Sequence, residues 1–456
     1  MDITKLTLTE TIKALEEKKF SKAELNEVYL DRINTFNPSL NVFIEVNKDS
    51  LGIPAGIKDV ISTKNIKTTA GSKILENYIP KYDATVVERL LRKGVSVIGK
   101  TNCDEFAQGG SGENSAFGPT KNPWDQTKVT GGSSSGSAAA VAADLAVFTL
   151  GTDTGGSIRQ PAALSGVVGL KPTYGRSSRY GLIAMASSLD CPGPFTKSVE
   201  DAGLVLDWMS GVDKLDSNVN PNKFNFNPQS LQSGIKGLRV GVPKEYFGAG
   251  LDSKVKEIIQ KAIKKLEELG AEIVEVSLPN SEYALAVYYV IVPSEVSSNM
   301  GRFDGIRFGK GRENIGEEVK RRIMLGTYAL SAGYYDEYYS KAAKVRTLVV
   351  QDFEKAFNPS AGSGCDVIVG PVSPTVAWNI GEKVDDPLSL YLADIYTVAG
   401  NLAGIPGLSV PCGFSDGLPV GLQILGKHFD EETVLKVGYA FEQATDFHKE
   451  KPRLAG

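Results

Sequence analysis

The chain has 456 residues and a formal net charge of −4. Hydrophobic residues make up 41% and charged residues 23%, which is typical of a globular protein with a large core. The charge gives no basic excess of the kind that non-specific nucleic-acid binding requires. The sequence shows neither a secretory leader nor an apolar run of about 18 residues or more, so we expect a cytoplasmic protein that does not span a membrane.

Histidine and cysteine usage excludes two common kinds of site. The only two histidines, His428 and His448, lie near the C-terminus, which argues against a histidine-ligated metal centre and a Ser-His-Asp triad. The four cysteines are far apart in the sequence and form no CxxC pair, so neither a zinc site nor a disulfide framework is indicated. If the chain is an enzyme, we expect its base not to be histidine.

The first 50 residues predict a helical segment. Capping boxes begin at Thr7 and Ser21, and each is followed by apolar residues at helical spacing. Asn37-Pro38 is expected to end the second helix, and residues 41–46 are expected to form a strand.

The rest of the chain predicts strands that alternate with helices, which indicates an α/β layered fold. We divide it into a core, 51–212, and a remainder, 213–456, because residues 213–233 are polar and typical of a surface loop. Asp83 is expected to cap a helix that extends to Arg92, and the charged segment 307–320 is expected to be a loop. Other expected helices follow the Gly/Ser segment 131–137 and cover 253–269, 334–357, 387–402 and 431–445; expected strands cover 95–98, 145–150, 238–242, 273–276, 367–369 and 420–424.

Residues 94–101 match the phosphate-binding pattern GxxxxGK[ST] in full. A phosphate-binding loop needs a strand before it and a helix after it. Here a predicted helix comes first, and the four variable positions form a β-branched run. We therefore expect a helix-ending glycine followed by a core strand.

Three glycine-containing segments carry the candidate chemistry, at residues 56–59, 131–138 and 151–162. Ser157 follows a predicted strand and two glycines, where successive amides can bind an oxyanion while a serine attacks a carbonyl. Lys58 lies among apolar residues, and burial favours a neutral lysine that can accept a proton. A Ser-Lys pair can replace histidine. Taken singly, however, such Gly/Ser runs are usually loops, and Lys58-Asp59 would usually be a surface pair.

Together and in this order, the segments GIKD, GGSSSGSA and GTDTGGSIRQPA resemble the amidase signature family. The resemblance implies a mixed, largely parallel twisted sheet that is covered by helices on both sides. It also implies a Ser-cisSer-Lys triad. Ser157 would be the nucleophile, Ser133 would follow a cis peptide bond and relay the proton, and Lys58 would be the base. The amides of Thr154, Gly155 and Gly156 would form the oxyanion hole.

Later segments resemble more narrowly the glutaminase subunits of the glutamyl-tRNA(Gln)/aspartyl-tRNA(Asn) amidotransferases. These segments lie at 288–291, 294–299, 302–307, 318–323, 331–335 and 386–388. The resemblance implies Arg322 on the carboxylate of glutamine, Asp394 on its ammonium group and Tyr288 beside it. Gln108 joins these substrate-binding candidates, although relatives generally carry methionine there.

The implied activity is release of ammonia from glutamine through an acyl-enzyme on serine. The implied partners are subunits B and C of the amidotransferase. The first, with ATP and Mg, would use the ammonia to amidate Glu-tRNA(Gln) or Asp-tRNA(Asn), and the second would clasp the other two together. Transfer RNA would bind mainly through the partner.

This chain itself would need no cofactor or metal. Two alternatives remain open: a stand-alone amidase that hydrolyses small carboxamides, and a non-catalytic scaffold. Shortened segments after Val46 and between 307 and 317 distinguish the chain from the glutaminase subunits that it resembles.

Overall fold

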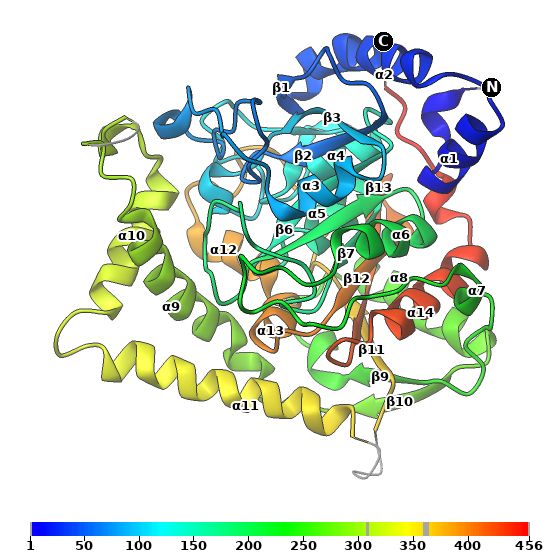
Figure 1. The fold of residues 1–456 in the computed structure, drawn as a ribbon. Helices are drawn as coiled ribbons and strands as arrows, with labels where there is room; N and C mark the ends of the chain where they lie inside the picture. Colours follow the sequence, from blue (N-terminus) through cyan, green and yellow to red (C-terminus); the bar gives the residue numbers. More distant parts are fainter. Residues whose placement is uncertain (1, 307–309, 359–363, 455–456) are drawn as a thin grey trace.

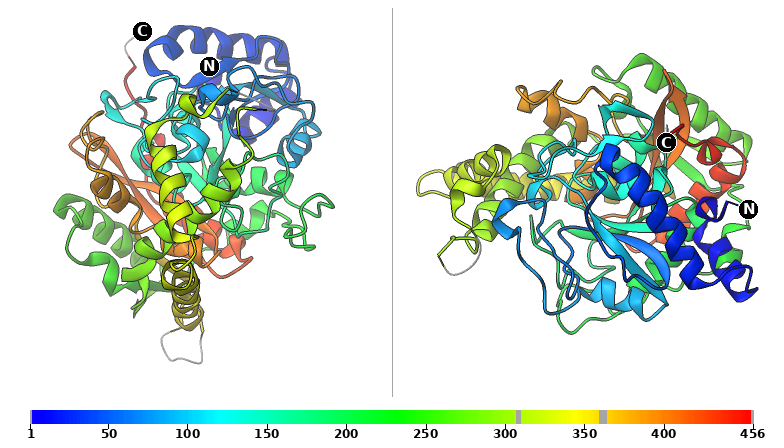
Figure 2. Two further views of the ribbon diagram at one scale, coloured as in Figure 1. Left: turned by 90° about the vertical axis from the view of Figure 1, so that its left-hand side faces the viewer. Right: turned by 90° about the horizontal axis from the view of Figure 1, so that it is seen from above.

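The computed structural model describes residues 2–306, 310–358 and 364–454. Its centre is an 11-stranded sheet, and helices lie on both faces of it (Figures 1 and 2). The mixed α/β architecture is therefore confirmed. The strands follow, in spatial order: β1 Phe43–Val46, β3 Val95–Thr101, β2 Ile53–Lys58, β6 Phe148–Asp153, β8 Cys191–Thr196, β7 Val168–Lys171, β12 Gly407–Ser415, β13 Leu418–Gly426, β11 Val367–Pro371, β9 Arg239–Pro243 and β10 Glu272–Val276.

Parallel pairing occurs in two parts of this sheet. Strands β3, β2 and β6 are mutually parallel, as are β11, β9 and β10. The strands between β6 and β11 pair antiparallel, and they include the hairpin of β12 and β13. The middle of the sheet is thus more antiparallel than the alternating pattern predicts, because the short connection between β12 and β13 permits a hairpin but no crossover.

The parallel strands β2 and β6 position the chemistry-bearing residues. They are direct neighbours, with Ile57 opposite Leu150, and every residue of both strands is buried. Their carboxyl ends therefore meet at one edge of the sheet. Lys58 ends β2 there, and Thr152 and Asp153 end β6.

At the N-terminus, both predicted capping boxes are confirmed, in α1 (Leu8–Glu16) and α2 (Lys22–Leu40). The expected end at Asn37-Pro38 is wrong, because α2 continues to Leu40. A proline in the last turn removes only one backbone hydrogen bond. The helix ends instead at Asn41, which has a left-handed backbone with φ 54°.

Helix α3 (Thr85–Leu91) and β3 agree with the prediction that residues 94–101 form a strand. The whole of β3 is buried, and Lys100 Nζ donates to Thr68 Oγ1 at 2.9 Å rather than facing an open loop. The expected capping role of Asp83 is wrong. The residue before α3 is Ala84, and Asp83 Oδ1 instead accepts a hydrogen bond from the backbone N–H of Lys64.

Three predicted segments prove more irregular than expected. The helix expected at 387–402 is broken into α12 (Pro387–Tyr391), η8 (Leu392–Asp394) and α13 (Val398–Leu402). The helix expected from 334 starts with a π-helical turn, Asp336–Ser340, before α11 (Lys341–Ala356). The expected strand at 145–150 starts only at Phe148.

Both predicted loops contain helix. Within 307–320, residues 307–309 lie outside the described part, and α10 (Glu317–Ala329) already begins at Glu317. The polar segment 213–233 includes the short α7 (Pro228–Leu231), whose Leu231 is buried in the core. The other described helices of the fold are α4 Ser135–Ala142, α5 Arg159–Ser165, α6 Val199–Met209, α8 Ser253–Glu268, α9 Ser281–Met300 and α14 Glu431–Gln443; a separate two-stranded sheet pairs β4 Lys121–Asn122 with β5 Asp125–Val129.

One main hydrophobic cluster contains residues from all three predicted regions, for example Leu8, Leu150 and Phe441. The boundaries at 50 and 212 stay predictions. Helices α9, α10 and α11 lie along one side of the sheet-containing body (Figure 1). Among the described helices, none is both long and apolar enough to cross a bilayer.

Candidate active site

Lys58 and Ser133 meet in the interior. Lys58 Nζ donates to Ser133 Oγ at 2.7 Å and to Thr152 Oγ1 at 2.9 Å, and all three side chains are buried. The peptide bond between Gly132 and Ser133 is cis, as the sequence predicts. The lysine, the serine and the end of β6 therefore form one hydrogen-bonded group.

The environment of Lys58 favours its neutral form. Burial lowers the pKa of its ammonium group from 10.5 to about 8, although the buried carboxylates of Asp104, Asp153 and Asp190 act in the opposite direction. No carboxylate of the described residues forms an ion pair with Lys58; its acceptors are hydroxyl groups. A lysine in this state can take up a proton near neutral pH.

The segment that carries Ser133 is held on two sides. Gln160 Oε1 accepts from Gly132 N at 2.9 Å, and Gln160 Nε2 donates to Gly110 O at 2.8 Å. Asp104 N donates to Ser133 O at 3.2 Å. These contacts fix the backbone on both sides of Ser133, and they tie it to the loop that contains Gly110.

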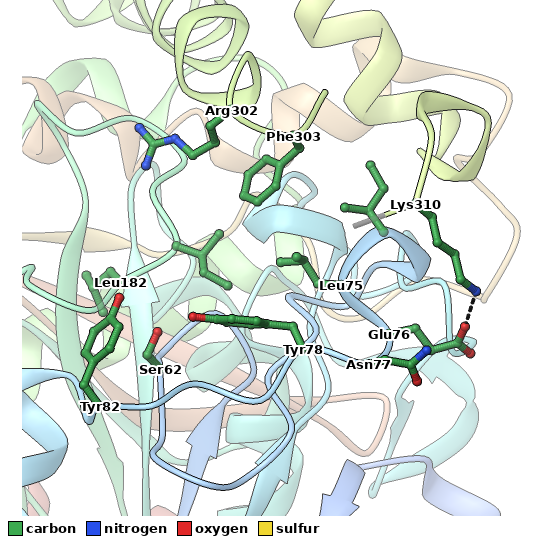
Figure 3. A pocket seen from close by; sticks show the side chains of 12 residues that line it. Ser62, Leu75, Glu76, Asn77, Tyr78, Tyr82, Leu182, Arg302, Phe303 and Lys310 are labelled. Atoms are coloured by element: carbon green, nitrogen blue, oxygen red, sulfur yellow. Dashed lines mark hydrogen bonds and ion pairs between the residues drawn. The ribbon is translucent and has the colours of Figure 1, made fainter. Parts of the chain in front are cut away.

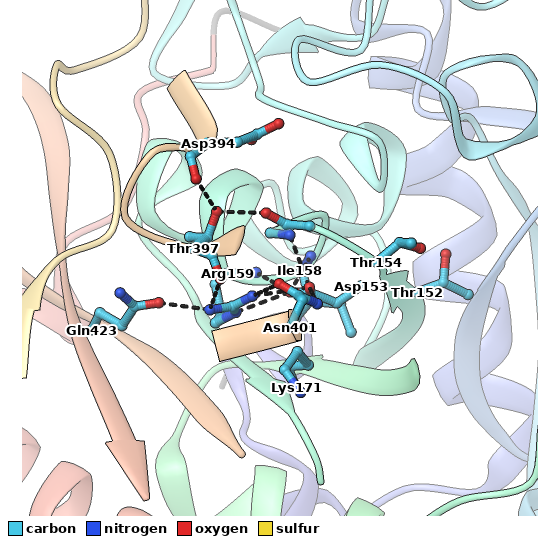
Figure 4. Close-up of polar contacts among 12 residues, drawn as sticks. Thr152, Asp153, Thr154, Ile158, Arg159, Lys171, Asp394, Thr397, Asn401 and Gln423 are labelled. Carbon is cyan, nitrogen blue, oxygen red and sulfur yellow. Dashed lines mark hydrogen bonds and ion pairs between the residues drawn. The ribbon is translucent and has the colours of Figure 1, made fainter. Parts of the chain in front are cut away.

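Ser157 lies on the loop between β6 and α5, which a buried ion pair anchors (Figure 4). Arg159 Nη2 and Asp153 Oδ1 are 3.1 Å apart, and both side chains are fully buried. Arg159 Nη1 also donates to Gln423 Oε1 at 2.7 Å. Although burial alone would raise it, Arg159 holds the pKa of Asp153 well below its usual range. Asp153 is thus a fixed anion that organises the following turn.

The backbone amides of this turn do not all fit the predicted oxyanion hole. Gly156 N donates to Asp153 Oδ1 at 2.9 Å, so the structure does not support Gly156 as an oxyanion donor. Asp153 uses this amide because it caps the turn before α5. The N–H groups of Thr154, Gly155 and Ser157 have no acceptor among the described residues, and neither has Ser157 Oγ a hydrogen-bond partner there.

Two contacts place the predicted pocket residues against this turn. A methyl group added at Gly155 would lie 2.5 Å from Tyr288 Oη, so the ring of Tyr288 packs directly on Gly155. Thr397 Oγ1 lies 2.6 Å from Gly155 O and 3.0 Å from Asp394 O. The α9 residue Tyr288 and the segment after η8 therefore both border the loop of Ser157.

Arg322 and Asp394 are both buried near aromatic rings. Arg322 Nε donates to Glu318 Oε1 at 2.8 Å, and its guanidinium carbon lies 5.4 Å from the centre of the Tyr289 ring. Tyr289 Oη is 3.4 Å from Asp394 Oδ2. A basic and an acidic side chain thus flank one aromatic ring without forming an ion pair with each other.

The carboxyl group of Asp394 lies near Gly110, at 3.7 Å from the position that a Cβ atom would take there. Burial raises the pKa of Asp394 to about 7, although the charge of Arg322 opposes the shift. An arriving cation would therefore stabilise the ionised form of Asp394.

Gln108 precedes Gly110 by two residues, and its side chain is fully buried. Neither its Oε1 nor its Nε2 has a hydrogen-bond partner among the described residues. An unpaired buried amide costs about 1–3 kcal/mol, so such a group calls for a bound partner. This position is compatible with the predicted substrate contact.

Other parts of the molecule do not join this group. The four cysteines are free and buried, and no cluster of three or more metal-ligating side chains occurs within the described ranges. A cavity of about 630 Å³ lies between the 62–82 region and Arg302, Phe303 and Lys310 (Figure 3). It is separate from the triad candidates; its Phe303 ring is 5.0 Å from that of Phe106, two residues before Gln108.

Comparison with known proteins agrees with this geometry. The family model described as Amidase matches residues 24–435. The chain belongs to the amidase family. It is 55% identical to the A subunit of the glutamyl-tRNA(Gln) amidotransferase of Caldanaerobacter subterraneus subsp. tengcongensis, with 100% of this chain and 99% of the relative covered. It is 54% identical to the protein of the same name from Thermoanaerobacter pseudethanolicus, with the same coverage.

Solved structures agree at the level of the whole chain. The crystal structure of the A subunit of glutamyl-tRNA(Gln) amidotransferase from Thermotoga maritima has a TM-score of 0.87 and 44% identity, covering 97% of this chain and 95% of that one. A 6-aminohexanoate cyclic dimer hydrolase has a TM-score of 0.90 at 25% identity, with 99% of each chain covered. The fold of this family therefore supports hydrolysis of different amides.

Sequence reasoning missed several residues that build the site. Thr152 and the Asp153–Arg159 pair lie inside the motif that identified Ser157, but their roles follow only from the folded loop. Tyr289, Tyr391 and Glu318 are also missing from the predicted pocket. The spacing of four residues between Glu318 and Arg322 on a helix was the available signal for that pair.

Proposed function

We propose that this chain is the glutamine-hydrolysing subunit of a tRNA-dependent amidotransferase. The observation that carries the proposal is the buried Lys58–Ser133 hydrogen bond beside a pocket that holds Arg322 and Asp394 apart. The first supplies a base without histidine, and the second offers one charge for each end of an amino-acid zwitterion. The names of the curated relatives support the same assignment.

In the proposed reaction, Ser157 Oγ attacks the carboxamide carbon of glutamine. Its proton passes to Ser133, whose own proton passes to neutral Lys58. The free amides of Thr154, Gly155 and Ser157 stabilise the oxyanion. When the C–N bond breaks, the proton returns through Ser133 to the leaving nitrogen. Ammonia departs and a glutamyl ester remains on Ser157, which water then hydrolyses to glutamate.

Substrate recognition follows from the charges in the pocket. Arg322 would bind the α-carboxylate, Asp394 the α-ammonium group, Tyr288 would line the space beside Gly155, and the unpaired amide of Gln108 would meet a polar atom of the substrate. A carboxamide without these charged groups would gain none of this binding energy. This feature favours glutaminase activity over a stand-alone amidase that acts on small carboxamides.

The ammonia would serve a partner. Because the curated relatives are named as subunits, we propose that subunits B and C of an amidotransferase assemble with this chain. The larger partner would receive the ammonia and, with ATP and Mg, amidate Glu-tRNA(Gln) or Asp-tRNA(Asn) in the cytoplasm. The small partner would hold the other two chains together, and tRNA would bind mainly to the amidating partner.

Ammonia release from glutamine tests the proposal. The full chain is assayed with and without the co-expressed subunits B and C, beside Ser157→Ala and Arg322→Ala. We expect Ser157→Ala to lose turnover and Arg322→Ala to lose glutamine selectivity. Turnover of glutamine that is unchanged in Arg322→Ala would instead favour the general amidase.

A further inference from the structure

Glu318 is a nearly buried carboxylate one turn before Arg322 on α10. Its Oε1 accepts from Arg322 Nε at 2.8 Å and from Tyr391 Oη at 3.0 Å, and its Oε2 pairs with Arg321. Both oxygens are therefore occupied by donors of this chain. Glu318 has no capacity left for a substrate, so its contribution must come through the groups that it holds.

The contacts of Glu318 limit how Arg322 can bind an anion. With Nε committed to Glu318, only Nη1 and Nη2 remain, and neither forms a hydrogen bond with a described residue. The guanidinium plane is further confined by Tyr289 and Tyr391, whose ring centres lie 5.4 and 5.7 Å from its carbon. A carboxylate can therefore approach Arg322 only end-on, through the two Nη atoms.

The same residues connect Arg322 to Asp394. Tyr391 stacks on Tyr289 with ring centres 3.9 Å apart, and Tyr289 Oη reaches Asp394 Oδ2 at 3.4 Å. The series Glu318, Tyr391, Tyr289 and Asp394 comes from α10, α12, α9 and η8. It can hold the two charged groups of the pocket at a fixed separation, although they belong to different elements.

We propose that Glu318 is a positioning residue that turns the Nη face of Arg322 towards the substrate and, through Tyr391 and Tyr289, fixes the distance between Arg322 and Asp394. The ligand class selected is an α-amino acid amide, whose carboxylate and ammonium group share one carbon atom. This inference rests on the proposed function, because it assigns the basis of selectivity to the same pocket.

The test compares two substrates in the full chain and any co-purified subunits. L-glutamine carries the α-carboxylate, whereas 4-aminobutanamide lacks it and cannot use Arg322. Glu318→Gln retains the volume but cannot accept from Arg321 and Arg322 at once. We expect it to raise the KM for glutamine by about 10–100-fold, with kcat and the turnover of 4-aminobutanamide within about threefold of wild type.

Two further variants keep the result interpretable. Arg321→Ala removes the exposed partner of Glu318 but leaves the Arg322 contact, so its glutamine KM should stay within about twofold of wild type. Tyr391→Phe removes the bond to Glu318 but keeps the stacked ring, and should raise the glutamine KM by a smaller factor than Glu318→Gln. Thermal unfolding identifies any variant that fails to fold.

The outcomes separate the inference from the function on which it rests. An equal loss for both substrates in folded Glu318→Gln, or an unchanged KM for glutamine, would overturn the positioning role. Failure of the wild-type protein to hydrolyse glutamine, while it hydrolyses 4-aminobutanamide, would overturn the proposed function and the inference with it.

Discussion

Lys58 is a buried base whose acceptors are two hydroxyl groups rather than a carboxylate. A direct ion pair would hold the lysine protonated, since an opposite charge at contact favours the charged form. Hydroxyl acceptors satisfy the amine without that effect, so burial dominates and lowers the pKa to about 8. The serine that receives the lysine hydrogen bond is also placed to exchange protons with it.

The pH dependence of turnover follows from this pKa. The active form of Lys58 is the neutral amine, which increases as pH rises through about 8, so kcat/KM for glutamine should increase over the same interval. Lys58→Arg should remove activity by about a thousandfold or more, because the guanidinium stays protonated. A pH–rate profile checks this. A rising limb of the same shape in a Lys58 variant would refute the assignment.

Adjacent serines provide a matched pair for the proton relay. Ser133 Oγ accepts from Lys58, whereas Ser134 Oγ donates to the backbone oxygen of Thr152. Ser133→Ala should lower kcat by about 100-fold or more, since it interrupts the proton path, and Ser134→Ala should lower it much less. Steady-state kinetics of the two variants measures the difference. Equal losses would indicate a packing effect rather than a relay.

Asp394 should give glutamine binding a second pH dependence. Its carboxyl pKa is raised to about 7, so the ionised form is depleted as pH falls below 7, and the KM for glutamine should rise there. In Asp394→Asn the KM should be higher throughout and lose this dependence. Calorimetric titration of glutamine into Ser157→Ala between pH 5.5 and about 8.5 separates binding from Lys58 chemistry. Affinity that does not change with pH would contradict the role of Asp394.

At this scale, the sequence predicts the residues within local motifs and misses those that act across elements. Lys58, Ser133 and Ser157 lie in short glycine-containing segments whose chemistry can be inferred from local sequence. Tyr289 and Tyr391 are about a hundred residues apart, and their stacking follows only from packing. The oxyanion role of Gly156 is not supported for a related reason: the sequence does not reveal that Asp153 takes up its N–H.

Among the elements, the strand ends and the interruptions of helices determine where the chemistry lies. Alternating patterns correctly predict β3, β9, β10 and β11 to within a few residues. They do not predict the break at residues 392–397, because that segment is apolar and helical in composition. Packing of Thr397 on Gly155 stabilises the break, and Asp394 lies within it. Contacts with another segment, rather than local propensity, therefore decide this conformation.

The close crossing of α9 and α10 should be sensitive to a single methyl group. A Cβ atom at Gly326 would collide with the backbone oxygen of Pro293, so Gly326→Ala must push the two helices apart. We expect a loss of about 1–3 kcal/mol in stability, together with a raised KM for glutamine, because Tyr288 and Arg322 lie on these helices. Thermal unfolding and kinetics measure both, with the exposed neighbour Thr327→Ala as control. An unchanged melting temperature would show that the crossing adapts.

The ion pair beneath the nucleophile loop should be essential for stability. Arg159→Met leaves Asp153 buried with its main charge partner removed, which should cost about 3–5 kcal/mol. Chemical denaturation measures the loss. Arg179→Met removes a guanidinium whose pair with Asp216 is partly exposed, and serves as the matched control with a smaller expected loss. Equal losses would show that burial of the Asp153 pair has no special weight.

Over the whole molecule, the pocket lies where α9 and α10 meet the sheet-containing body. The body supplies the triad candidates and Asp394, and the helices supply Tyr288 and Arg322 (Figure 1). A glutamine molecule bound between them would contact both parts. The alternating pattern predicts the layered fold, whereas the order of the strands and the position of these helices depend on contacts that are distant in sequence.

Covalent labelling of the full chain with 6-diazo-5-oxo-L-norleucine, a diazoketone analogue of glutamine, tests the central claim most directly. The account predicts one adduct, located by peptide mass spectrometry on Ser157, which is lost in Ser157→Ala and suppressed by excess glutamine. Labelling that persists in Ser157→Ala, or that glutamine does not suppress, would contradict Ser157 as the nucleophile of a glutamine-binding site.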